Sequence, residues 1–290
     1  MNRQKVGVIG VGMMGHGIAL NILKNGYPLT FLDHPGNQPV GDLIALGAKP
    51  GISVADVAKF AEVIILCVTG TPQVEAVVYG EDGLLSNLRP GTVVIDCSTA
   101  IPSSSQRIAH DIESKGGRFM DAPMTRTPKE AAAGRLNLIV GSEESLFEQQ
   151  EPLLRAFAEN VTYAGAVGSG HQMKLLHNFV SMGFAAILAE AAACAEKSGV
   201  GKAVFLEVLS KGGGDGVVLN RMRPYIESGD DSGFRFSLPN GLKDLTYYHT
   251  MAEQAGAYSV MAQAAKNTFA EGASQEPQAT IPELVRLLKK

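Results

Sequence analysis

Near its start the chain passes from a short apolar segment through a glycine-rich turn into a helical pattern. Residues 5–9 favour a strand, the turn reads Gly10-Val-Gly12-Met13-Met14-Gly15, and apolar residues then recur at helical spacing up to Gly26. A lone G-x-G-x-x-G arises by chance in glycine-rich chains and can be a purely structural turn, but here it stands between a strand and a helix. The motif therefore predicts a fold that opens with a dinucleotide-binding βαβ unit.

Each glycine of this turn has a physical task. Gly10 permits the tight turn, Gly12 lets a pyrophosphate approach the backbone, and Gly15 lets helix and strand pack closely. The phosphates would lie on free N–H groups at the helix N-terminus, where Met13 and Met14 also belong to the candidate cofactor site.

A second strand, residues 28–33, ends in Asp33. Its carboxylate would accept hydrogen bonds from the adenosine ribose hydroxyls and repel a 2′-phosphate. We therefore expect NAD as the preferred cofactor, with NADP not excluded.

Strand and helix signals alternate up to residue 164, which predicts an α/β fold with a doubly wound, mainly parallel Rossmann sheet in a domain of residues 1–164. We expect Ser53 to cap a helix that ends near Phe60. The further strands are expected at 63–68, 92–96, 118–121, 136–140 and 160–164, and the further helices at 101–115 and 143–158.

The pattern changes at Gly168, after which strand signals stop. A long helix is expected at about 168–197, and its middle, residues 179–195, is apolar nearly all round, as in a helix that packs against a second domain or subunit. Glu190 interrupts the apolar run, which argues against a membrane span. Shorter helices at 202–209, 217–227, 242–255, 259–271 and 281–290 complete an all-helical C-terminal domain, 165–290, joined to the first by the long interdomain helix.

Lys174 and Asn178 lie four residues apart on this helix and so share one stripe, with Gly170 one turn earlier. The missing side chain at Gly170 would let a small molecule approach the backbone beside the lysine amine. The alternative is a solvated lysine with a capping asparagine. A lysine acts as a base near neutrality only when desolvated or placed near another cation, for which Lys243 is a candidate. His171 and His177 are rival bases, although both lie off the stripe.

Two loops after strands carry further candidates, because such sheets bind ligands outside the carboxyl ends of their strands. Thr99 can reach a nicotinamide or ribose, or can simply cap the helix after Pro102. Thr125 and Arg126 follow a later strand, and the planar guanidinium suits a carboxylate, sulfonate or phosphate. The alternative for Arg126 is a solvated surface arginine.

Composition excludes several partners. The net charge of −4 and a pI near 5.9 argue against nucleic acid. The cysteines, Cys67, Cys97 and Cys194, are widely spaced, so neither a metal site nor a disulfide framework is expected, and a reducing cytoplasm fits. Glycines interrupt the apolar start, which favours a strand over a secretion signal. We therefore expect a small anionic substrate and no membrane.

Four motifs together resemble the β-hydroxyacid dehydrogenase family, which includes 3-hydroxyisobutyrate dehydrogenase and tartronate semialdehyde reductase. They occur in the family's order and span nearly the whole chain: GVGMMG from Gly10, DAP from Asp121, GSGHQMKLLHN from Gly168 and LKDL from Leu242.

The resemblance implies that Lys174 is catalytic and that Asn178 orients substrate and lysine. It also implies that Lys243 contacts the nicotinamide and substrate region, that Thr99 lies beside the nicotinamide and that Asp33 binds the ribose. Family members are typically homodimers or homotetramers built around the interdomain helix.

Two departures concern the substrate. His177 stands where members usually have an asparagine, and Thr125-Arg126-Thr127 stands where many have Ser-Gly-Gly. An arginine in this loop is similar to the sulfolactaldehyde reductases of the family. We hypothesise a substrate that carries a strong anion bound by Arg126, or one larger than hydroxyisobutyrate.

The function predicted from the sequence is an NAD(P)-dependent oxidoreductase that interconverts a small β-hydroxyacid and its semialdehyde. Two alternatives are an imine reductase on the same scaffold and a non-catalytic dinucleotide-binding protein. Imine reductases usually carry an acidic or aromatic group in place of the lysine, so Lys174 argues against the first.

Overall fold

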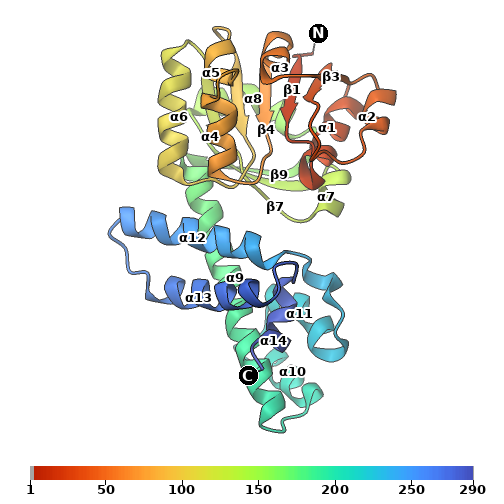
Figure 1. Ribbon diagram of the computed structural model, residues 1–290, viewed down its shortest axis with the longest axis vertical. Coiled ribbons are helices and arrows are strands. Elements are labelled where there is room, and N and C mark those ends of the chain that lie inside the picture. The colour runs from red at the N-terminus through yellow and green to blue at the C-terminus, as the bar shows by residue number, and fades with distance from the viewer. Residues whose placement is uncertain (1–2, 290) are drawn as a thin grey trace. The chain divides into compact units, whose positions relative to one another are not determined.

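The computed structural model describes residues 3–289 and divides the chain into two compact units, Met1–Lys174 and Leu175–Lys290 (Figure 1). The division falls inside helix α9 (Ser169–Lys197), whereas the prediction placed a boundary at 164/165, ahead of this helix. Each unit is described by itself below.

The first unit is built on one sheet with strand order β3-β2-β1-β4-β5-β6-β8-β7, and β9 lies beside β8. The pairs from β3 to β6 are parallel, whereas β8 runs antiparallel to both β6 and β7. The predicted mainly parallel, doubly wound sheet is confirmed. The strands are β1 Val6–Ile9, β2 Leu29–Leu32, β3 Lys49–Gly51, β4 Val63–Leu66, β5 Val93–Asp96, β6 Arg118–Asp121, β7 Met124–Thr125, β8 Leu136–Gly141 and β9 Ala158–Gly165.

Helices cover both faces of this sheet. Successive strand residues point to opposite sides, and apolar residues on both sides need to be buried. In β4, Val63 and Ile65 join a core with α1 and α8, while Ile64 and Leu66 join a second core with α3, α4 and α6. The helices of the unit are α1 Met13–Lys24, α2 Gly41–Ala45, α3 Val54–Phe60, α4 Thr71–Tyr79, α5 Leu84–Asn87, α6 Pro102–Ser114, α7 Pro128–Ala132 and α8 Glu144–Leu154.

Local signals located most of these elements. Ser53 caps α3 as predicted, since its hydroxyl accepts the N–H of Asp56 at 3.1 Å. The helix predicted at 143–158 is wrong beyond Leu154, because the chain turns there and β9 begins at Ala158. The short elements β3, α2, α4, α5, β7 and α7 were not predicted.

The second unit consists of helices packed around the middle of α9, which is drawn in green in Figure 1. Met182, Ala185 and Ala189 of α9 are buried against side chains from the helices that follow. Small residues let these helices approach closely. They are α10 Lys202–Ser210, α11 Val217–Ser228, η1 Asp231–Phe234, α12 Leu238–Gln254, α13 Val260–Gln275, η2 Ile281–Glu283 and α14 Leu284–Leu287. The predicted end of the last helix, Lys290, lies outside the described residues.

Helix α12 begins earlier than the predicted residue 242. Pro239 lies in its first turn, where no intrahelical N–H is required. Gly241 is needed for packing, since a Cβ there would come within 2.5 Å of the Phe269 ring. Lys243 lies in the second turn of α12, whereas the predicted helix 242–255 would have placed it in the first turn.

Helix α9 is also the one helix among residues 3–289 that is long and apolar enough to cross a membrane by length and composition. The core helix of a globular domain meets the same criterion, and the packing of α9 in the second unit accounts for its apolar middle.

Candidate active site

The glycine turn between β1 and α1 adopts the geometry that its sequence predicts. Gly10 has a φ of 97°, a value that favours glycine, and a Cβ there would lie 2.3 Å from the Cys67 carbonyl oxygen. A Cβ on Gly15 would lie 1.9 Å from the Gly10 carbonyl oxygen. Both glycines are therefore required for the turn and for the close packing of helix and strand.

Gly12 differs from its neighbours. Apart from Gly12 and its two chain neighbours, no heavy atom of the described residues lies within 4 Å of the place that its Cβ would take, so the backbone here is open to a ligand. Gly12 is also the N-cap of α1 and supplies no side-chain acceptor, and Met13 beside it is 67% exposed. An uncapped helix N-terminus with accessible backbone fits the pyrophosphate of a dinucleotide.

The end of β2 lies beside this turn. Asp33 follows β2 directly and is exposed, which suits a role in holding ribose hydroxyls. Asn37 ties the two segments together: its Oδ1 accepts the N–H of Val11 at 3.3 Å, and its Nδ2 donates to the Leu32 carbonyl at 2.9 Å. Asn37 could not be identified from the sequence, because nothing local connects it to a turn so far away in the chain.

The loop after β5 holds Thr99, which is half-buried. Helix α6 has Ile101 as its N-cap, and the N–H of Ile101 is bound by the Thr71 hydroxyl at 2.9 Å. The alternative that Thr99 caps this helix is therefore wrong. Its place beyond the carboxyl end of β5 remains compatible with a cofactor contact.

Asp121, at the carboxyl end of β6, holds the beginning of α9. Its two oxygens accept the backbone N–H groups of Gly168 and His171, each at 2.7 Å. Burial raises the pKa of the Asp121 carboxyl, against the lowering effects of His171 and of these two N–H groups. A buried carboxylate from the sheet thus caps the long helix.

This arrangement corrects the role expected for Gly170. A Cβ on Gly170 would lie 2.4 Å from the Ile139 carbonyl oxygen and 2.8 Å from an Asp121 oxygen. The missing side chain therefore lets α9 lie against β8 and Asp121. It does not open a path for a small molecule.

His171 is fully buried in the same network. Its Nε2 donates to the Ser98 carbonyl oxygen at 3.1 Å, and its Nδ1 lies 2.8 Å from the Ser105 hydroxyl. Both ring nitrogens are therefore occupied and shielded from solvent, so His171 serves the packing of α9 and is not an accessible base.

The two predicted substrate residues lie after β6. The Thr125 hydroxyl accepts from Asn137 Nδ2 at 3.2 Å. Arg126 is ion-paired with Glu159 and donates from Nη1 to the Arg135 carbonyl oxygen. Its backbone φ is 83°, a value that residues other than glycine rarely adopt. Arg126 is thus an ion-paired residue and not a solvated surface arginine.

In the second unit, Asn178 belongs to a buried polar chain. It is 7% exposed, and its Nδ2 donates to Asp244 Oδ2 at 2.6 Å. Lys243 Nζ lies 3.3 Å from Asp244 Oδ1 and 5.7 Å from the centre of the Tyr247 ring. Asn178 is in the interior of α9, so the alternative of a capping residue is wrong.

Lys243 and Lys174 both lie in surroundings that differ from those of a solvated lysine. Asp244 partly compensates the charge of Lys243, which reduces its effect as a cation on any neighbouring amine. Lys174 itself is half-buried and lies one helical turn before Asn178 on α9. The alternative of a fully solvated lysine is therefore not observed.

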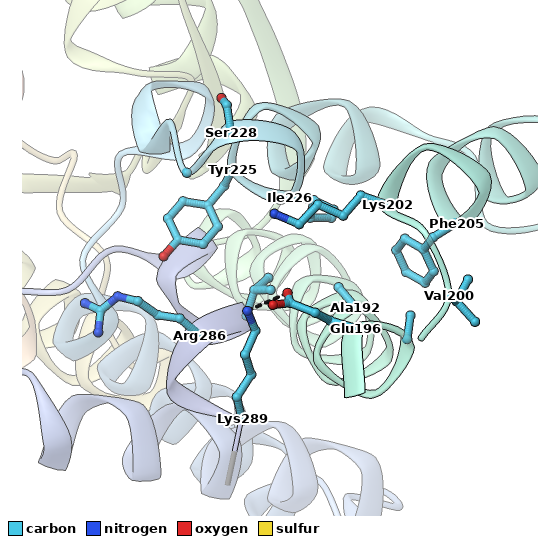
Figure 2. Close-up of a pocket in the computed structure, with 13 residues that line it drawn as sticks. Ala192, Glu196, Val200, Lys202, Phe205, Tyr225, Ile226, Ser228, Arg286 and Lys289 are labelled. Carbon is cyan, nitrogen blue, oxygen red and sulfur yellow. Dashed lines mark ion pairs between the residues drawn. The ribbon is translucent and has the colours of Figure 1, made fainter. Parts of the chain in front are cut away.

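The second unit also has a cavity of about 210 Å³ (Figure 2). Lys289 and Glu196 form an ion pair at 2.5 Å in its wall, and Tyr225 and Phe205 add aromatic surface. Its lining within residues 3–289 contains none of the predicted site residues.

Comparison with known families divides the chain in a similar way. Residues 5–165 match the NAD binding domain of 6-phosphogluconate dehydrogenase, and residues 168–288 match the NAD-binding domain of NADP-dependent 3-hydroxyisobutyrate dehydrogenase.

Individual relatives agree with these matches. The chain is 30% identical to 3-hydroxyisobutyrate dehydrogenase of Pseudomonas aeruginosa, over 91% of this chain and 90% of the relative. It is 34% identical to 3-sulfolactaldehyde reductase of Escherichia coli K12, over 71% of this chain and 68% of the relative. The structure of Mycobacterium tuberculosis 3-hydroxyisobutyrate dehydrogenase superposes with a TM-score of 0.89 over 99% of this chain and all of the other, at 24% identity. The chain therefore belongs to the β-hydroxyacid dehydrogenase family of NAD(P)-dependent oxidoreductases, which act on CH–OH groups.

Proposed function

We propose that this enzyme interconverts a small anionic β-hydroxyacid and its semialdehyde, with Lys174 as the general acid and base. The observation that carries this proposal is the pairing of Lys174 with Asn178, one turn apart on α9, where Asn178 is buried and held by Asp244. A buried, hydrogen-bonded amide is a fixed donor and acceptor, as the orientation of a reacting group requires.

In the oxidative direction Lys174 Nζ takes the proton of the substrate hydroxyl, and in the reductive direction it returns a proton to the aldehyde oxygen. The nicotinamide supplies the acceptor or donor of hydride when bound. Asn178 orients the hydroxyl and the amine, and Thr99 and Lys243 contact the nicotinamide region. The residues Gly10, Gly12, Met13, Met14 and Gly15 hold the pyrophosphate.

NAD is the proposed preferred cofactor. The exposed carboxylate of Asp33 at the end of β2 supports this choice, since it would bind ribose hydroxyls and repel a 2′-phosphate. The proposal requires a higher kcat/KM with NAD than with NADP.

Thr125 and Arg126 are the proposed binders of the substrate anion. A guanidinium offers two parallel donors to a sulfonate or carboxylate. Because Arg126 is ion-paired with Glu159, a substrate anion would have to share or replace that partner.

We further propose a homodimer or homotetramer in a reducing cytoplasm. Leu176, Val180 and Ile187 recur along one side of α9 at heptad spacing and are 42%, 67% and 55% exposed. A groove of about 320 Å³ runs between this stripe and α13, where Met261 is 59% exposed. A second copy of the chain would cover such a surface.

The proposed function is tested by assaying hydroxyacids and semialdehydes, sulfonates included, with NAD and with NADP. Lys174→Ala should lower kcat on the best substrate by about 10²- to 10⁴-fold, the range of general acid–base catalysis. NAD affinity should stay unchanged, and Lys115→Ala, an exposed lysine on the first unit, should behave as wild type. A Lys174→Ala variant with full activity would contradict the mechanism.

The same assay separates the alternatives. Turnover of cyclic imines without turnover of any hydroxyacid would favour an imine reductase. Binding of NAD without turnover of either class would favour a non-catalytic binding protein.

A further inference from the structure

His177 contacts the side chain of the residue that follows it. His177 Nδ1 lies 3.0 Å from Asn178 Oδ1. On the other side of the same amide, Asn178 Nδ2 lies 2.6 Å from Asp244 Oδ2. The buried amide of Asn178 is thus held at both ends, and all three residues belong to the second unit.

The chemistry of these groups fixes the direction of each hydrogen bond. A carboxylate only accepts, so the amide nitrogen must face Asp244. The amide oxygen then faces His177, and because a carbonyl oxygen only accepts, His177 must carry a proton on Nδ1. If the amide turned over, its oxygen would face the Asp244 carboxylate and its N–H groups would face His177.

Asn178 is only 7% exposed, so water does not readily replace a lost partner of Oδ1. Asp244 is 2% exposed and also pairs with Lys243 Nζ. The result is a continuous polar chain from Lys243 through Asp244 and Asn178 to His177. His177 is the end of this chain that faces the amide oxygen.

We propose that His177 is a positioning residue that sets the orientation of the Asn178 amide through its Nδ1–H. The inference deepens the proposed function, since it rests on the use of Asn178 in the reaction. His177 itself does not exchange a proton with the substrate, and its effect on turnover passes through Asn178.

A kinetic comparison tests the consequence. His177→Phe keeps a flat ring but removes the donor, and should lower kcat on the best substrate by about five- to tenfold, the effect of one neutral hydrogen bond. The KM for NAD should not change. His177→Asn, which restores an N–H donor, should recover most of the loss, and His110→Phe, an exposed histidine of α6, should have no effect. Wild-type kcat in His177→Phe, or an equal loss in His177→Asn, would overturn the proposal.

The hydrogen bond between His177 and Asn178 can be tested without measuring enzyme turnover. In the full-length protein labelled with ¹⁵N-histidine, at a pH about two units above the ordinary histidine pKa of about 6.5, we expect a proton on His177 Nδ1. In Asn178→Leu that preference should be lost. An unprotonated Nδ1 in the wild type, or the same state in Asn178→Leu, would overturn the inference. If no substrate is turned over, the proposed function fails while this measurement still decides the contact.

Discussion

Arg126 occupies a backbone conformation that glycine adopts without cost. Its φ of 83° places a Cβ and a long side chain in the left-handed region, which costs about 1–2 kcal/mol for an L-residue. A glycine would adopt this backbone conformation without that cost. The guanidinium at this site thus comes with backbone strain, as is common where a side chain serves recognition.

Two substitutions separate that strain from recognition. Arg126→Gly and Arg126→Ala both remove the guanidinium and its ion pair with Glu159, but only the alanine retains a Cβ at positive φ. We expect the glycine variant to be more stable by about 1 kcal/mol in chemical denaturation. Both should lose about tenfold or more in kcat/KM for the anion that Arg126 is proposed to bind, roughly the loss of one charge-assisted hydrogen bond.

Equal stability of the two variants would mean that the positive φ is not strained. Unchanged kcat/KM on every carboxylate and sulfonate would remove Arg126 from the substrate site.

At this scale the sequence indicated residues whose task is local. The three glycines of the turn and the Ser53 cap follow from backbone conformation and hydrogen bonding within a few residues. Asp244, Asn37 and Glu159 could not be identified as partners, because each contact joins segments far apart in the chain. The place of His171 off the Lys174 stripe argues against its acting as a base, but its contacts with Ser98 and Ser105 could not be predicted, because no local pattern connects these residues to it.

Among the elements, α9 depends most on a single side chain from elsewhere. Asp121 accepts two N–H groups at its beginning, and the chain passes so close that Gly170 has no room for a side chain. Such a buried cap orients the first turn of the helix more firmly than an exposed one would.

Asp121→Asn tests this cap. One oxygen becomes an NH₂ group that faces a backbone N–H, so one buried donor loses its acceptor at a cost of about 1–3 kcal/mol. We expect the midpoint of thermal unfolding to fall, while Asp82→Asn on an exposed loop leaves it unchanged.

The stability difference between the wild type and Asp121→Asn also depends on pH. Because burial raises the pKa of Asp121, the folded protein binds this proton more tightly than the unfolded chain does. Lowering the pH through the raised pKa therefore stabilises the wild type relative to Asp121→Asn, and the gain is complete below the ordinary value of 3.8. The difference in unfolding temperature should therefore grow as the pH is lowered from 7 towards 3.8, and a difference that shrinks over this range would contradict this account.

The sequence predicted whether a segment forms a helix or a strand better than it predicted where each element begins and ends. Periodicity located the parallel strands other than the short β3, and it located the long helix, since these elements depend on many residues at once. The end of α8 and the beginning of α12 were wrong, because tertiary packing decides whether Ala158 pairs with β8 and whether Gly241 fits against Phe269.

For the molecule as a whole, the exposed stripe of Leu176, Val180 and Ile187 is the strongest indication of self-association. In the proposed oligomer, Val180→Glu and Ile187→Glu would each place a carboxylate in a buried, unpaired position. We expect both to lower the molar mass measured by light scattering at micromolar concentration. Val204→Glu offers a matched control, because Val204 is 58% exposed on α10, away from the stripe. Dissociation by Val204→Glu alone would place the interface elsewhere.

The division of the chain inside an unbroken helix has a consequence for recombination between relatives. No flexible linker separates the two compact units, since Lys174 and Leu175 are consecutive residues of α9. A chimaera with its crossover between them keeps Gly168 and His171 with their own Asp121, and Asn178 with its own Asp244. A crossover in the loop before α9 would instead combine Asp121 of one relative with the helix start of another. Joining genes of relatives at this one peptide bond therefore keeps these hydrogen bonds within each unit intact.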